Sequence, residues 1–309
     1  MQTSAVVRKI LGFYEADNPG VKANLQRILM TGKLAGTGKM IILPVDQGFE
    51  HGPARSFAAN PDAYDPHYHF QLALDAGLNA FAAPLPMLEA GADTFAGQIP
   101  LILKVNSANS LIPDTAPKTQ AITGSVDDAL RIGASAIGFT VYPGSSVALD
   151  MFNDVVAMRA EAAAKGLVTV IWSYPRGEAL DKDGETAADI TTYAAHLAAL
   201  LGAHIIKVKL STAHLAQAEA KKVYEGEKID VSTSAARVRD VVKSCFNGRR
   251  LVVFSGGAKK GAESILDDAR AIRDGGGNGS IVGRNSFQRP RKEALEMLGN
   301  LVEIYKGKF

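Results

Sequence analysis

Eight short apolar runs that alternate with helix-forming segments predict that this chain folds as a single (β/α)8 TIM barrel. The runs lack the polar alternation of half-exposed strands, which is typical of strands buried on both faces of a parallel sheet. No linker rich in Pro, Gly or Ser interrupts the series. The alternative is an open doubly wound sheet, which usually has a G-x-G-x-x-G turn after its first strand. This chain has "DQGFEHG" at that place, so we favour the barrel.

Each element is expected from its own pattern. The predicted strands lie at 40–45, 78–83, 99–105, 135–141, 167–173, 203–208, 251–255 and 279–283. The predicted helices lie at 61–77, 125–133, 147–166, 184–202, 231–245, 261–276 and 289–307. Gly77 and Gly133 are expected C-caps, and residues 106–123 have no long helical pattern and are expected to form a loop. We divide the chain into an N-terminal helical extension with one leading helix, 1–35, and a barrel domain, 36–309.

Composition excludes several classes of protein. The formal net charge is +2, from 34 basic and 32 acidic residues, so neither a nucleic-acid nor a membrane partner is expected. Cys245 is the only cysteine, which rules out a disulfide within the chain and fits a reducing compartment. The N-terminal segment contains Glu15 and Asp17 and no long apolar core, so no signal peptide is expected. We therefore expect a cytoplasmic protein.

Two glycine-containing turns follow the last two predicted strands. "SGG" at 255–257 and "GRN" at 283–285 lie where barrels of this kind frequently bind phosphate. Glycines let backbone N–H groups approach an anion closely, and an arginine offers a planar fork to phosphate oxygens. Tight turns alone would also explain the glycines, but two such turns on neighbouring strands favour a phosphate site. The phosphate ligands we expect are Ser255, Gly256, Gly257, Gly283 and Arg284.

The sixth predicted strand carries Lys207 and Lys209, which point to the same face because strand side chains alternate. A lysine that is desolvated or lies beside another cation has a lowered pKa, and its neutral amine can form a Schiff base with a carbonyl. Lys104 on the third strand adds a further positive charge. Either lysine could instead pair with Asp46 or Glu50, or bind phosphate. The residues alone do not choose between Lys207 and Lys209.

Tyr174 follows the fifth strand in "WSYPRG" and is a candidate proton carrier. We expect nearby cations to favour its phenolate form. A hydrogen-bonded core tyrosine is the alternative. Asp46 ends the first strand and is expected to face the same end of the barrel. The alternative is that its carboxylate only caps a helix or orders the loop that follows. Further candidate substrate ligands at the carboxyl ends of strands are Trp172, Lys209, Lys104, Arg176 and His51.

Metal catalysis is the rival chemistry, and the histidines argue against it. His67 and His69 are two residues apart in a predicted helix, so they do not share a face. His196 lies in mid-helix, and His204 lies at the wrong end of its strand. No three histidines form a convincing ligand set. We expect an enzyme that needs neither a metal nor another cofactor.

Seven motifs in order resemble the archaeal-type class I fructose-bisphosphate aldolases, which also occur in bacteria. They are "VDQGFEHGP", "PLILKVN", "GASAIGFTVYPGS", "WSYPRG", "AHIIKVK", "FSGG" and "VGRN", and the resemblance covers residues from about 35 to about 305. It implies a (β/α)8 barrel that cleaves fructose 1,6-bisphosphate through a lysine Schiff base without a metal. It also implies a homo-oligomer, often a decamer. The family commonly has "DHG" where this chain has Asp46-Gln47-Gly48.

Carried over motif by motif, the resemblance assigns the Schiff base to Lys207 and the main proton transfer to Tyr174. Trp172 would shape the site, and Asp46 would contact the substrate hydroxyls and assist proton transfer. "SGG" and "GRN" would hold the phosphate next to the ketone.

Three functions are then weighed. The first is a class I fructose-1,6-bisphosphate aldolase that forms dihydroxyacetone phosphate and glyceraldehyde 3-phosphate. The second keeps the Schiff base and changes the phosphorylated ketone, as in a shikimate-pathway aldol or transaldol enzyme or a thiolase acting on a phosphorylated dione. The third is a barrel that binds a sugar phosphate without turnover.

Overall fold

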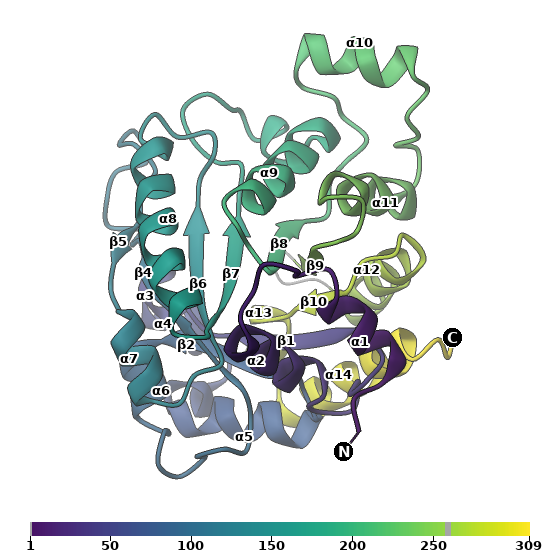
Figure 1. The fold of residues 1–309 in the computed structure, drawn as a ribbon. Helices are drawn as coiled ribbons and strands as arrows, with labels where there is room; N and C mark the ends of the chain where they lie inside the picture. Colours follow the sequence, from purple (N-terminus) through teal and green to yellow (C-terminus); the bar gives the residue numbers. More distant parts are fainter. Residues whose placement is uncertain (1, 257–260) are drawn as a thin grey trace.

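The computed structural model describes residues 2–256 and 261–309, and within these ranges eight parallel strands close into a barrel (Figure 1). The strands are β1 (Met40–Pro44), β2 (Ala80–Pro84), β3 (Leu101–Lys104), β6 (Ala136–Val141), β7 (Val168–Ser173), β8 (Ile205–Lys209), β9 (Leu251–Ser255) and β10 (Gly279–Ile281). Around the barrel their order is β1-β10-β9-β8-β7-β6-β3-β2. The predicted (β/α)8 fold is confirmed.

Helices cover the outside of the barrel and close its hydrophobic core. The longer ones are α5 (Pro66–Ala76), α8 (Ala148–Ala164), α9 (Ala188–Leu200), α11 (Ser234–Ser244), α12 (Ala262–Asp274) and α14 (Arg291–Tyr305). Shorter ones are α3 (Gln47–His51), α4 (Pro53–Phe57), η1 (Pro61–Tyr64), α6 (Leu85–Glu89), α7 (Val126–Arg131), η2 (Gly184–Thr186) and α13 (Arg284–Phe287). Gly77 ends α5 with φ 68°, a left-handed conformation that glycine adopts without steric cost.

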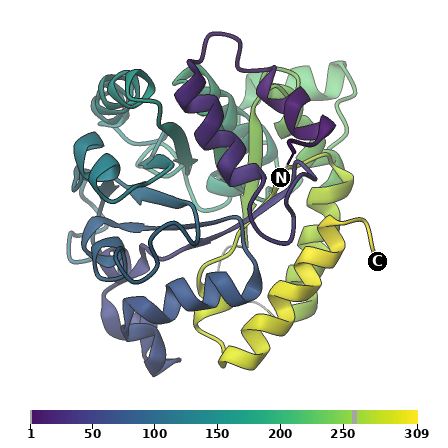
Figure 2. The ribbon, with the colours of Figure 1, turned by 60° about the horizontal axis from the view of Figure 1, so that its bottom comes forward.

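The N-terminal segment forms two helices where one was predicted, α1 (Ala5–Leu11) and α2 (Pro19–Leu29). Asn18 caps α2 with its side chain, and Pro19 occupies the first helical position, where a missing N–H costs nothing. Figure 2 shows both helices (purple) lying against the barrel. Their buried residues, such as Val7 and Leu25, share one apolar cluster with the barrel interior. The N-terminal extension and the barrel share core contacts, so the domain boundary after residue 35 stays a prediction.

Alternate residues of each strand point into the barrel, which determines where the site residues lie. Lys207 on β8 pairs in register with Trp172 on β7 and Val253 on β9, and Trp172 and Val253 belong to the interior cluster. Two residues further on, Lys209 pairs with Ser255. Both lysines therefore face the barrel interior near the carboxyl ends of the strands, as predicted.

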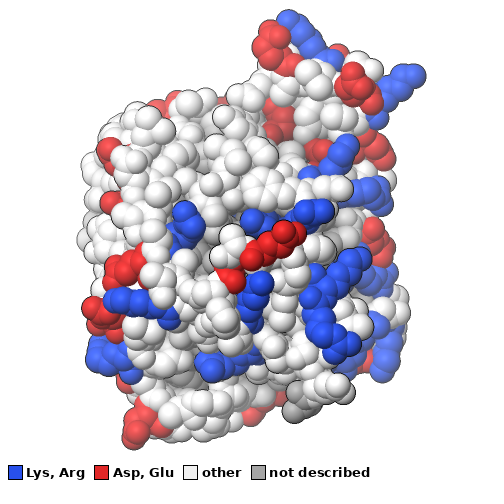
Figure 3. Space-filling view, viewed as in Figure 1, with Lys and Arg blue, Asp and Glu red and all other residues white. Residues whose placement is uncertain are grey.

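Two excursions leave the regular pattern. In the predicted loop 106–123, two short strands, β4 (Asn106–Ser107) and β5 (Ala121–Ile122), pair antiparallel. The helix α10 (Ala218–Gly226) was not predicted, and none of its residues is buried. It projects from the body of the molecule in Figure 1, and Figure 3 shows charges of both signs on it. Within the described residues, no helix is both long and apolar enough to cross a membrane.

Candidate active site

A cavity of about 70 Å³ lies at the carboxyl ends of the strands. Its polar lining consists of Asp46, Gln47, Glu50, His51, Tyr174, Arg176, Lys207, Lys209, Ser255, Gly256, Gly283, Arg284 and Asn285. These residues come from five strands or from the loops that follow them. The end of the barrel is where the fold places chemistry. We call this space the central cavity.

Lys207 lies at the bottom of the central cavity, with only 5% of its surface exposed. Its Nζ is 5.2 Å from the centre of the Tyr174 ring and 5.7 Å from the centre of the Trp172 ring. Burial lowers the pKa of Lys207 to about 8. The negative charges of Asp46 and Glu50 oppose this shift, whereas the positive charges of Arg176 and Arg284 add to it. A substantial fraction of this amine is therefore neutral near physiological pH, which a nucleophile for a carbonyl requires.

Lys209 has a different environment, which the sequence did not reveal. Its Nζ lies 3.7 Å from the Glu185 carboxylate, and its side chain is 23% exposed. Burial and the neighbouring Arg176 lower the pKa of Lys209, while Glu185 favours its charged form. Since it has a carboxylate partner and more contact with solvent, Lys209 is the weaker candidate for a neutral nucleophile. The structure thus distinguishes the two lysines on physical grounds.

Lys104 and Trp172 lie beneath the central cavity and do not line it. The Lys104 side chain donates to the backbone oxygen of Asn106 and, over 2.9 Å, to its Oδ1. Lys104 is 3% exposed, and burial lowers its pKa to about 8. The Trp172 ring lies against Gly138, where an added Cβ would come within 2.2 Å of the indole. Neither residue is among those that line the cavity, so the structure does not support the direct substrate contact that we expected of Lys104 and Trp172.

Tyr174 is partly buried beside Lys207, but its ionisation is opposite to our expectation. Burial raises the pKa of Tyr174, and the charges of Asp46 and Glu50 raise it further, outweighing Arg176 and a hydrogen bond with Ser255. The prediction that nearby cations would favour the phenolate was therefore wrong, because desolvation of the anion dominates. Tyr174 is a neutral phenol that can donate and recover a proton.

Two carboxylates follow β1. Asp46 precedes α3 and lines the cavity, and its side chain makes no capping hydrogen bond to that helix. Glu50 lies 3.5 Å from both the Tyr142 hydroxyl and the His51 imidazole. Burial and the charge of Asp46 raise the pKa of Glu50. Burial also lowers the pKa of His51, and the positive charges of Arg284, Arg55 and Arg176 lower it further.

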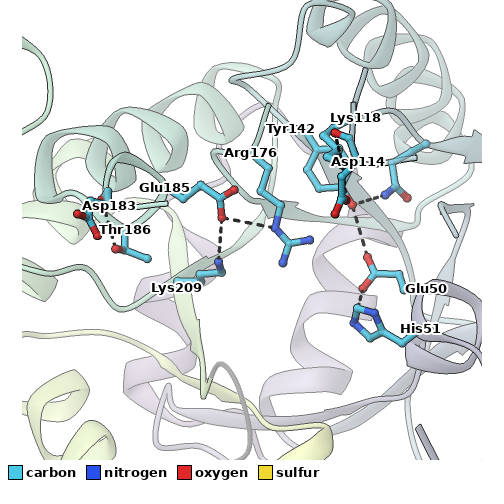
Figure 4. A network of polar contacts seen from close by, with 11 residues as sticks. Glu50, His51, Asp114, Lys118, Tyr142, Arg176, Asp183, Glu185, Thr186 and Lys209 are labelled. Carbon is cyan, nitrogen blue, oxygen red and sulfur yellow. Dashed lines mark hydrogen bonds and ion pairs between the residues drawn. The ribbon is translucent and has the colours of Figure 1, made fainter. Parts of the chain in front are cut away.

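From the sequence, Glu50 was considered only as a partner for the lysines, and no role was predicted for Tyr142 or Glu185. Figure 4 shows that they link the loops around the cavity: Glu50 reaches Tyr142, and Glu185 lies between Lys209 and Arg176. Glu50 and Tyr142 follow strands, and this position marks them as candidate site residues. Glu185 opens a helical segment far from any strand end, and nothing in its pattern marks it.

The predicted phosphate ligands lie together across β9 and β10. Ser255, Gly256, Gly283 and Arg284 all line the central cavity, whereas Gly257 lies outside the described residues. The Asn285 amide donates to the Gly256 carbonyl over 3.5 Å and so joins the two turns. An added Cβ on Gly283 would lie 2.8 Å from the Pro44 carbonyl, so that turn has no room for a side chain.

Three of the histidines are engaged away from the central cavity. His69 is buried and bonds the Ala63 carbonyl, and His204 bonds Asp17 and accepts from the Thr169 N–H. His196 bonds the Ser244 carbonyl. Within residues 2–256 and 261–309, no three His, Cys, Asp or Glu side chains are grouped to hold a metal ion. Independence from metals stays a prediction.

The family model "DeoC/LacD family aldolase" matches residues 40–289. The class 1 fructose-bisphosphate aldolase of Thermoproteus tenax is 37% identical over 89% of this chain and 92% of its own length. A probable class 1 fructose-bisphosphate aldolase of Chlamydia muridarum is 35% identical over 95% of this chain and 87% of its own length.

A solved structure of an archaeal fructose-1,6-bisphosphate aldolase has its catalytic lysine covalently bound to the carbinolamine intermediate of the substrate. It is 33% identical with a TM-score of 0.74, and the match covers 91% of this chain and 98% of that one. The chain therefore belongs to the DeoC/LacD aldolase family and, within it, to the class 1 fructose-bisphosphate aldolases.

Proposed function

We propose that this protein cleaves fructose 1,6-bisphosphate reversibly to dihydroxyacetone phosphate and glyceraldehyde 3-phosphate, through a Schiff base on Lys207. The observation that carries the proposal is the buried amine of Lys207, whose lowered pKa leaves it partly neutral in the same cavity as the candidate phosphate ligands. The activity for which the relatives are named supports the choice of substrate.

The first half of the reaction uses Lys207 and Tyr174. The neutral amine adds to the C2 ketone, and the resulting carbinolamine loses its hydroxyl as water when Tyr174 donates a proton. The product is an iminium, which withdraws electrons from the neighbouring carbon–carbon bond. The neutral state of the Tyr174 phenol suits this donation, because a phenolate has no proton to give.

In the second half, the C4 hydroxyl gives up its proton to Asp46 or to the Tyr174 phenolate left by the first step. The C3–C4 bond then breaks, its electrons form the enamine, and the aldehyde is released. Protonation of the enamine carbon and addition of water to the iminium return the ketone and the free amine. The electrons of the C3–C4 bond stay in the enamine and form the new C–H bond when its carbon is protonated, so no redox partner is required.

The other residues are proposed to bind the substrate. Ser255, Gly256, Gly283 and Arg284 hold the phosphate next to the ketone, and Gly257 belongs to the same proposal although it lies outside the described residues. Lys209, Arg176 and His51 line the cavity and contact the rest of the substrate. Trp172 and Lys104 support Lys207 from below.

We further propose that the enzyme needs no metal or other cofactor, since the iminium itself supplies the electron sink. It is proposed to act in the cytoplasm as a homo-oligomer, with a decamer as the family expectation. Exposed apolar side chains on α8, α9 and α10, including Leu149 and Leu200, support self-association. Light scattering coupled to gel filtration tests the oligomeric state.

The central experiment is trapping of the Schiff base. The protein is incubated with dihydroxyacetone phosphate and EDTA, reduced with borohydride, digested and mapped by mass spectrometry. We expect the adduct on Lys207. An adduct on Lys209 would overturn the residue assignment, and the absence of any adduct would overturn the mechanism. Cleavage of fructose 1,6-bisphosphate in a coupled assay then separates this activity from related Schiff-base enzymes that use other phosphorylated ketones.

A further inference from the structure

Gln47 lines the central cavity, and the proposed reaction gives it no role. It follows Asp46 after β1 and is the first residue of α3. It stands where the matching motif of the family commonly has a histidine, so an amide replaces an imidazole at this point of the wall. A role for Gln47 rests on the proposed function and concerns how the phosphate next to the ketone is bound.

The fold uses the backbone of Gln47 and not its side-chain amide. The hydroxyl of Ser56, a buried residue of α4, donates to the Gln47 carbonyl over 2.8 Å. The side-chain Oε1 is shielded from solvent and has no hydrogen-bond partner among residues 2–256 and 261–309, and the Nε2 donates no hydrogen bond within these ranges. A shielded amide without a partner lowers stability, whereas an apolar side chain of the same shape would not. The fold alone therefore gives no reason for a glutamine here.

The amide of Gln47 lies beside the turn that follows β10. An added Cβ on Gly283 would lie 3.1 Å from the Gln47 Nε2 and 2.8 Å from the Pro44 carbonyl. The sheet brings these segments together, because β1 and β10 pair in parallel with Ile42 opposite Ile281. The chain therefore leaves both strands at the same level. Gln47 borders the proposed phosphate ligands on the side of β1.

A neutral donor suits this position because the cavity already contains many charges. Its charged groups are Asp46, Glu50, Arg176, Lys207, Lys209 and Arg284. Four of them, Asp46, Glu50, Arg176 and Arg284, act on the pKa of Lys207, so a further cation or carboxylate would shift the fraction of neutral amine. A primary amide donates two N–H groups and does not titrate. Gln47 can therefore bind an anion without disturbing the nucleophile.

We propose that Gln47 is a ligand of the phosphate next to the ketone, with its Nε2 donating to a phosphate oxygen. The amide adds a hydrogen bond from the side of β1 to those offered by the turns after β9 and β10. It transfers no proton to the substrate. Gln47 thus strengthens the preference of the enzyme for a phosphorylated ketone over the same ketone without phosphate.

The experiment compares dihydroxyacetone phosphate with dihydroxyacetone, which lacks the phosphate. The protein is incubated with each ketone at increasing concentrations and reduced with borohydride. Mass spectrometry then gives the concentration at which half of Lys207 is modified. The value for dihydroxyacetone divided by the value for dihydroxyacetone phosphate measures selectivity for phosphate. A change in the reactivity of the Lys207 amine affects both ketones alike and cancels in this ratio.

Two variants of Gln47 test the amide. Gln47→Met keeps an unbranched side chain and removes the N–H groups, so the ratio should fall about tenfold, a usual loss for a hydrogen bond to a charged group. Gln47→Glu has nearly the same shape and places a carboxylate against the phosphate, so the ratio should fall about a hundredfold. Gln98→Glu is the matched control, because Gln98 is exposed and its amide donates to the Thr94 carbonyl. Its ratio should equal that of the wild type.

An unchanged ratio in either Gln47 variant would overturn the phosphate ligand. An equal loss of trapping with both ketones would overturn it as well, because the amide would then act on Lys207 and not on the phosphate. If the wild-type protein forms no adduct with dihydroxyacetone phosphate, the proposed function itself fails, and that result differs from an unchanged ratio.

Discussion

Replacing Lys207 by methionine should abolish the Schiff base and at the same time stabilise the fold. The ordinary pKa of the lysine, 10.5, falls to about 8 in the folded protein. The unfolded chain thus binds the proton more tightly, and folding at neutral pH carries the cost of a buried ammonium. A shift of about 2.5 pKa units corresponds to about 3 kcal/mol at pH 7. Methionine keeps an unbranched apolar stem and removes this cost.

The sign of the pH dependence is determined by the same shift. A folded-state pKa below the unfolded value makes the wild-type protein gain stability as the pH rises from about 8 toward 10.5. The advantage of Lys207→Met should therefore shrink from about 3 kcal/mol at pH 7 to about 1.4 kcal/mol at pH 9.5. The attraction of Asp46 and Glu50 for the ammonium is already contained in the shifted pKa.

Urea unfolding at the two pH values, followed by circular dichroism, measures both quantities. Lys222→Met is the control, since that lysine is 70% exposed in a surface ion pair and its removal should change stability by less than about 1 kcal/mol. A Lys207→Met protein that unfolds at lower urea than wild type at pH 7 would refute the reasoning. So would an advantage that does not change between the two pH values.

Three further predictions concern the neighbours of Lys207. Tyr174→Phe keeps the ring and removes the proton carrier, so kcat for fructose 1,6-bisphosphate should fall about 10²- to 10⁴-fold in steady-state assays. An unchanged kcat would exclude Tyr174 as the proton carrier. Gly138→Ala places a methyl group 2.2 Å from the Trp172 indole and should destabilise the fold by about 1–3 kcal/mol in urea unfolding. Glu50→Gln removes a carboxylate that favours the Lys207 ammonium, so the pH profile of borohydride trapping should move to lower pH. A profile that moves to higher pH would contradict the assigned electrostatics.

The fold was predictable because the periodicity of apolar residues is a local signal. Strand β9 was predicted at its observed bounds, and the other seven strands within two residues. The helix α10 was missed because it buries no residue, so no core-facing stripe marks it. The two-helix N-terminus was read as one helix, although Asn18 and Pro19 are a recognisable start signal for α2.

The candidate site was predictable as a set of residues, and less so in its ionisation. The rule that barrel sites lie at the carboxyl ends of strands gave Asp46, Tyr174 and the pair Lys207 and Lys209 as candidates, and only the family resemblance chose Lys207 from that pair. The protonation state of Tyr174 could not be predicted from the sequence, because it depends on the burial of the phenol and on the carboxylates of Asp46 and Glu50, which follow a different strand. Glu185 escaped notice for the same reason, since its partners are distant in the chain.

The sequence by itself determined the barrel, the end of the barrel that carries the chemistry, and the residue types available there. Hydrophobic periodicity and the alternation of strand side chains are properties of residues that are neighbours in the chain, so both can be read from the sequence. Only the tertiary structure decided that Lys207 has the more neutral amine, that Lys209 is tied to Glu185, and that Lys104 lies below the cavity. Desolvation and charge pairing depend on side chains brought together from all around the barrel, and one stretch of chain does not contain them.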